Sequence, residues 1–81
     1  MNTIAIAFGT VLRRLRKDVE MTQEQLGFEA GLQRKYISEL ELGIKSPSLE
    51  SVMKIASALK IPPGDFVELV WKAIPTMKSG C

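Results

Sequence analysis

Residues 22–43, TQEQLGFEAGLQRKYISELELG, predict two short helices joined by a tight turn. Thr22 can cap the first helix, because its hydroxyl accepts a hydrogen bond from an amide of the first turn, and Gln25 completes a reciprocal capping box. Gly31 ends this helix, since glycine adopts the left-handed conformation without a Cβ clash, and Gly43 ends the second. Helices this short are unstable alone in water, so the rest of the chain must pack against them.

The flanking sequence predicts three further helices, which makes the expected fold all-α. Apolar residues recur there at helical spacing. The five predicted helices span residues 6–19, 23–30, 33–42, 49–59 and 63–72. In a chain of 81 residues they form one compact domain, residues 1–74, followed by a flexible tail, residues 75–81.

Composition removes several classes of function. Histidine is absent and Cys81 is the single cysteine, so the chain lacks the commonest general base and zinc ligand and cannot form an intrachain disulfide. We therefore expect no enzyme activity, no metal, no cofactor and, without a sensor domain, no small-molecule ligand. No apolar run approaches the ~20 residues that a membrane helix needs, which predicts a cytoplasmic protein with no membrane association. The net charge of +2 is spread over both halves and does not by itself indicate nucleic acid.

The spacing of residues in and around the two short helices is specific enough to indicate a family. These residues are Thr22, Gln23, Leu26, Ala30, Gly31, Leu32, Tyr36, Ile37, Ser38, Glu41 and Gly43, with Arg16 and Lys17 before them and residues 47–50, PSLE, after them. The pattern resembles the helix-turn-helix of Cro/C1-type (XRE) DNA-binding proteins, which include phage repressors and the controller proteins of restriction–modification systems. The resemblance implies a five-helix, lambda-repressor-like fold and a sequence-specific regulator that binds double-stranded DNA.

In the geometry of this family the second helix of the motif, residues 33–42, lies in the major groove with its first turn at the base edges. The predicted base contacts are Gln33, Arg34, Lys35, Tyr36, Ser38 and Glu39. Arg34 can donate two hydrogen bonds to guanine, and Gln33 can pair with adenine. For Arg34 and Lys35 the alternative is an ordinary solvated side chain. Tyr36 is either a DNA contact or an aromatic at the edge of the core, and Glu39 either accepts from cytosine, repels phosphates or is inert.

The resemblance also implies roles for residues outside that helix. Gln23 matches a position that contacts a phosphate and braces the start of the recognition helix, and Lys45 is a second candidate phosphate contact. Arg16 and Glu41 match positions that form an internal salt bridge between the first helix and the end of the third. We therefore interpret Arg16 and Glu41 as structural residues.

Three positions depart from the family pattern, and Phe28 has two alternative roles. Glu20 replaces a usual glycine, so it must take a positive φ at a cost or end the first helix in another way. Gly27 replaces a usual alanine, which either costs up to about 1 kcal/mol of helix propensity or permits a close approach of helices. Phe28 lies off the inner edge of its helix and is either packed against a neighbour or an exposed contact. Leu42 replaces a polar or basic residue, which puts one DNA backbone contact in doubt.

The last predicted helix has a wider apolar surface than a small bundle can bury. One short recognition helix contacts too few base pairs to select a site in a genome, so we expect a homodimer on an inverted repeat. Val67 and Trp71 on the last helix are the predicted dimer interface. The alternative is that Trp71 folds back over Ile4 and Ile6.

Two functions from different classes follow from these patterns. The first is a transcription regulator that blocks or recruits RNA polymerase, which is then a candidate partner. The alternative is an antitoxin or protein-partner-binding module, whose last helix and tail bind another protein while DNA binding is secondary. A stable complex with the product of a neighbouring gene would favour the alternative.

Overall fold

The computed structural model describes residues 2–74, which form five helices and no strand. These are α1 (Thr3–Asp18), α2 (Gln23–Ala30), α3 (Arg34–Glu41), α4 (Leu49–Ala58) and α5 (Pro63–Lys72). The prediction of an all-α fold is confirmed. The predicted tail, residues 75–81 with Cys81, lies outside the described residues.

The largest difference from the predicted helices is the start of α1. This helix begins at Thr3 and not at residue 6, because Asn2 caps it. The side-chain oxygen of Asn2 accepts hydrogen bonds from the amides of Ile4 at 2.9 Å and Ala5 at 3.3 Å. The apolar periodicity on which the prediction depended starts later than this polar cap. α3 is one residue shorter at each end than predicted, because Gln33 and Leu42 are its cap residues.

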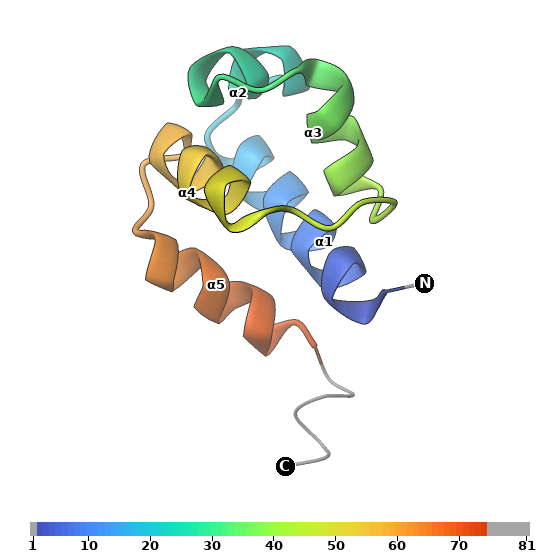
Figure 1. Ribbon diagram of the computed structural model, residues 1–81. Helices are drawn as coiled ribbons and strands as arrows, with labels where there is room; N and C mark the ends of the chain where they lie inside the picture. Colours follow the sequence, from blue (N-terminus) through green and yellow to red (C-terminus); the bar gives the residue numbers. More distant parts are fainter. Residues whose placement is uncertain (1, 75–81) are drawn as a thin grey trace.

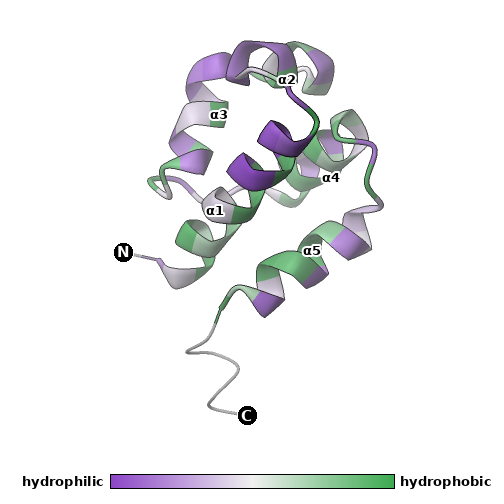
Figure 2. Ribbon diagram, turned by 180° about the vertical axis from the view of Figure 1, so that it is seen from behind, coloured by the Kyte–Doolittle hydropathy of each residue, from purple (hydrophilic) through white to green (hydrophobic). Residues whose placement is uncertain are grey.

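The five helices are arranged so that α1 and α4 lie between the two ends of the molecule (Figure 1). α2 and α3 pack on each other at one end, and α5 lies at the other, in contact with both α1 and α4. Figure 2 shows hydrophobic residues along much of α5 and hydrophilic residues over much of α2. The surfaces of α2 and α5 are therefore suited to different contacts.

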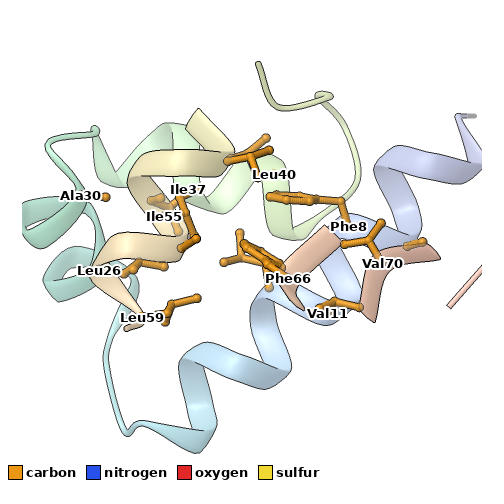
Figure 3. Packing of buried hydrophobic residues seen from close by; sticks show 14 of the residues in the cluster. Phe8, Val11, Leu26, Ala30, Ile37, Leu40, Ile55, Leu59, Phe66 and Val70 are labelled. Carbon is orange, nitrogen blue, oxygen red and sulfur yellow. The ribbon is translucent and has the colours of Figure 1, made fainter. Parts of the chain in front are cut away.

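Every helix contributes to one hydrophobic core (Figure 3). The largest fully buried side chains are Phe66, Leu12, Leu26, Ile37, Leu40, Ile55 and Val11. The rings of Phe8 on α1 and Phe66 on α5 are stacked with their centroids 5.1 Å apart. Burying each such side chain contributes about 1.5–3 kcal/mol. Ile37 and Leu40 therefore fix α3 firmly to the rest of the domain.

Two of the positions that depart from the family pattern have a clear structural consequence. Glu20 has a φ of 59°, so it adopts the left-handed conformation that a glycine would adopt without strain. Gly27 is buried, and a Cβ there would lie 2.7 Å from the carbonyl oxygen of Leu32. The close approach at Gly27 is thus to the backbone of the turn between α2 and α3.

Phe28 and Leu42 are both exposed, Phe28 to 85% of its surface. For Phe28 the structure agrees with the alternative of an exposed side chain and not with packing against a neighbour. Trp71, Ile4 and Ile6 each keep between 41% and 45% of their surface exposed, so each of these side chains leaves part of its surface available for other contacts.

A close approach of two helix backbones that was not predicted involves Gly9 on α1. This residue is buried, and a Cβ at Gly9 would meet the carbonyl oxygen of Leu40 and lie 2.6 Å from that of Glu41. Any side chain at this position would push α1 and α3 apart. Gly9 therefore fixes the distance between α1 and the end of α3.

Candidate nucleic-acid interface

α2, the first helix of the motif, is capped by hydrogen bonds at both of its ends. The Gln25 amide donates to the Thr22 hydroxyl at 3.0 Å, and the Thr22 amide donates to the Gln25 side chain at 2.8 Å. At the other end, Gly31 has a φ of 69°, and the Leu32 amide donates to the Gly27 carbonyl at 2.8 Å. The predicted capping box and glycine cap are both confirmed. The glycine cap gives α3 a defined direction relative to α2.

α3 has one buried side and one exposed side, as a helix inserted into a DNA groove requires. Ile37 and Leu40 are fully buried, whereas Gln33, Arg34 and Lys35 at its start are exposed. Gln33 is the N-cap residue, and its side chain makes no capping hydrogen bond. Three of the predicted base contacts therefore project from the first turn of a firmly packed helix.

An open groove of about 450 Å³ runs along the exposed side of α3. Its lining residues are Gly31, Leu32, Gln33, Lys35, Tyr36, Glu39 and Lys45. The groove thus brings together four of the six predicted base contacts and one of the two predicted phosphate contacts. Arg34 and Ser38 do not line it; Arg34 is exposed and Ser38 is partly buried.

Tyr36 has features of both of its predicted roles. Its ring packs against the core and also lines the groove. Its hydroxyl lies 3.0 Å from the hydroxyl of Ser51, which is buried in α4 and also accepts a hydrogen bond from the Ser48 hydroxyl at 2.9 Å. Tyr36 therefore connects the recognition helix to the start of α4.

A cluster of polar side chains connects α1, α2 and α3 behind the groove. Arg16 donates to both carboxylate oxygens of Glu41, from Nε at 2.6 Å and from Nη2 at 3.0 Å, and its Nη1 donates to the Met21 carbonyl at 2.7 Å. The side chains of Arg16 and Glu41 are only 11% and 4% exposed. The hydrogen bond to Glu41 is the main cause of a raised pKa for Arg16, with the charge of Glu41 adding to it and burial opposing it.

Gln23 belongs to the same cluster, whereas the family resemblance implied that it braces the start of α3. Its side-chain amide donates to a carboxylate oxygen of Glu41 at 3.0 Å. Gln23 thus braces the end of α3 through Glu41, and its predicted phosphate contact stays a prediction. Lys45 also has a partner that was not predicted, because its ammonium group lies 3.3 Å from the carboxylate of Glu39.

The described part of the chain contains neither a candidate metal site nor a candidate membrane-spanning helix. Among residues 2–74 no group of histidine, cysteine, aspartate and glutamate side chains could hold a metal ion. Nor does any helix in that range combine the length and the apolar character needed to cross a membrane.

A capped helix pair, with polar and basic side chains projecting from the start of a buried second helix, defines the class of helix-turn-helix DNA-binding proteins. A family model described as helix-turn-helix matches residues 12–66. The chain belongs to this XRE-type helix-turn-helix family.

Among the relatives of this chain are controller proteins of restriction–modification systems. It is 40% identical over 68 residues to Control protein C.BamHI of Bacillus amyloliquefaciens, over 83% of this chain and 84% of the relative. The crystal structure of the controller protein C.AhdI from Aeromonas hydrophila superposes with a TM-score of 0.74 at 39% identity, over 76% of this chain and 94% of that one. A point mutant of C.Esp1396I bound to its highest affinity operator site superposes with a TM-score of 0.84 at 26% identity, over 91% and 97% of the two chains.

Proposed function

We propose that this protein is a sequence-specific transcription regulator that binds an inverted-repeat operator as a homodimer, with α3 in the major groove. The observation that carries the proposal is the exposed start of α3, with Gln33, Arg34 and Lys35 above the buried Ile37 and Leu40. Likeness to C.BamHI and C.AhdI supports genes of a restriction–modification system as the regulated genes. Because chromosomal DNA is the proposed ligand, we place its action in the cytoplasm.

Each residue at the start of α3 has a proposed role set by its chemistry. Arg34 donates to the O6 and N7 atoms of a guanine, and Gln33 pairs with an adenine. Lys35 contacts a guanine or a phosphate. Ser38 and the ring of Tyr36 contact neighbouring bases, while the Tyr36 hydroxyl keeps its bond to α4.

Phosphate contacts fix the orientation of the protein on the duplex and are proposed at both ends of the motif. Gln23 is the first residue of α2, where the positive end of the helix dipole attracts an anion. Lys45 follows α3 and is about half exposed at the rim of the groove.

The proposed dimer interface is the outer side of α5 with the apolar groove beside it. This groove of about 300 Å³ is lined mainly by apolar side chains of α1, α4 and α5, including Val67. Val67, Trp71 and Leu49 are all exposed on the single chain, Leu49 to 71%. Contiguous exposed apolar surface of this kind is typical of an interaction site. A second copy of the chain would cover it and bring two recognition helices to successive half-sites.

Control of transcription would then depend on where the operator lies. A dimer over the promoter excludes RNA polymerase, and a dimer beside it offers polymerase a protein surface. In the second case RNA polymerase is the proposed second partner.

Selection of bound sites from a random duplex library tests the proposed function. We expect an enriched inverted repeat whose half-sites are about one helical turn apart. Affinity for the enriched duplex should fall with salt, with a log–log slope of about −0.9 for each phosphate contact. Equal affinity for the enriched duplex and a scrambled one, at an ionic strength of about 0.15 M, would refute the proposal.

A further inference from the structure

The groove along α3 contains one ion pair at the place where DNA would bind. Glu39 is the one acidic side chain among the described residues that line this groove, and its carboxylate lies 3.3 Å from the ammonium group of Lys45. Lys35 lines the groove one helical turn before Glu39, at the i,i+4 spacing that puts two side chains on the same side of a helix. Glu39 therefore lies further along the same groove as the predicted base contacts.

The backbone after α3 determines where Lys45 lies. The amide of Ile44 donates to the carbonyl oxygen of Glu39 at 3.1 Å, so the residue before Lys45 is bound to the residue with which Lys45 pairs. The residue after it, Ser46, accepts a hydrogen bond from the side chain of Asn2 at 3.2 Å. Lys45 is thus held between two tethered neighbours, within reach of Glu39.

Burial distinguishes this ion pair from an ordinary surface pair. The Glu39 side chain is 22% exposed and the Lys45 side chain is 54% exposed, so the carboxylate lies in the wall of the groove and the ammonium group at its rim. In the pair of Lys54 and Glu50 on α4 the carboxylate side chain is instead 75% exposed. A carboxylate fixed in the groove wall would repel DNA phosphates if no cation neutralised it.

We propose that Glu39 and Lys45 act together as one specificity-determining unit, in which Glu39 accepts a hydrogen bond from the N4 amino group of a cytosine. Lys45 neutralises the carboxylate, so that an acid is tolerated close to the phosphates, and it faces the nearest phosphate. Carboxylates accept from cytosine N4 in the major groove, whereas the edges of adenine, guanine and thymine present different patterns. The inference rests on the proposed function, because it needs α3 to enter that groove.

The test compares full-length variants on the duplex selected by the wild-type protein. Glu39→Ala removes the acceptor, and we expect it to lower the preference for one C·G pair in each half-site by about 5- to 150-fold. Glu39→Gln removes only the charge. We expect Lys45→Met to weaken binding at least threefold more in the wild-type background than in the Glu39→Gln background, because an unneutralised carboxylate is left only in the former. Lys54→Met, which breaks the exposed pair on α4, is the matched control and should leave affinity unchanged.

The outcomes separate this inference from the proposed function. If the wild-type protein has no sequence preference, the proposed function fails. If the wild-type protein selects a site, the inference alone is overturned by either of two results. The first is an unchanged base preference in both Glu39 variants at every position. The second is the same cost of Lys45→Met in both backgrounds, which would make Lys45 a phosphate contact that acts independently of Glu39.

Discussion

Replacing Arg16 by methionine should destabilise the domain far more than the loss of its packing explains. The change removes three hydrogen bonds, two to Glu41 and one to the Met21 carbonyl. It leaves the Glu41 carboxylate, whose side chain is 4% exposed, with the amide of Gln23 as its one remaining side-chain donor among residues 2–74. Stranding one partner of a buried pair costs about 3–5 kcal/mol. A domain of 81 residues has a total stability of only about 4–12 kcal/mol.

Urea denaturation followed by circular dichroism would measure this effect in a double-mutant cycle. The cycle uses Arg16→Met, Glu41→Gln and the two changes combined. We expect the combined change to cost at least about 2 kcal/mol less than the sum of the single changes, because neither charge is then stranded. Lys54→Met, in the exposed pair with Glu50, should cost no more than about 1 kcal/mol. Additivity at positions 16 and 41 within about 0.5 kcal/mol would refute the reasoning.

Three further predictions concern other positions. Gly9→Ala should lower the free energy of unfolding by about 2 kcal/mol or more, because its Cβ would meet backbone oxygens of α3. The control is Gly64→Ala, where a Cβ would have no atom within 4 Å, and it should change the free energy of unfolding by less than about 1 kcal/mol. Equal effects of the two changes in denaturation curves would contradict the close approach at Gly9. Glu20→Gly should raise stability by up to about 1 kcal/mol, because it relieves the left-handed strain at φ 59°; a lower melting temperature would argue against that strain. Trp71→Ala should raise the dimer dissociation constant at least tenfold in analytical ultracentrifugation; an unchanged constant would remove Trp71 from the interface.

The helices and their caps could be predicted from local sequence, because the interactions that form them are local. Thr22 with Gln25, and Gly31 as the end of α2, depend on residues within a few positions of one another, and both are as predicted. The predicted start of α1 was wrong, because the residue that caps this helix, Asn2, precedes the apolar periodicity. The prediction gave weight to hydrophobic spacing and not to the polar residue before it.

Contacts between residues far apart in the chain were not predictable from the same patterns. The need for a glycine at position 9 arises from carbonyl groups of residues 40 and 41 on another helix. The pairing of Glu39 with Lys45 depends on how the chain turns after α3, which is set by the hydrogen bond of the Ile44 amide. The pairing of Arg16 with Glu41 was expected only from the family resemblance, since nothing in their spacing indicates it.

The measurement that bears most directly on the proposed reading of DNA is the base preference of Arg34→Ala, compared with wild type by selection from the same random library. Arg34 is exposed on the first turn of α3, so its loss should leave the fold intact. We expect the variant to lose its preference for one guanine in each half-site and to bind the wild-type operator about 1–3 kcal/mol more weakly. Enrichment of the same sites with the same affinity would contradict the claim that the start of α3 reads the operator.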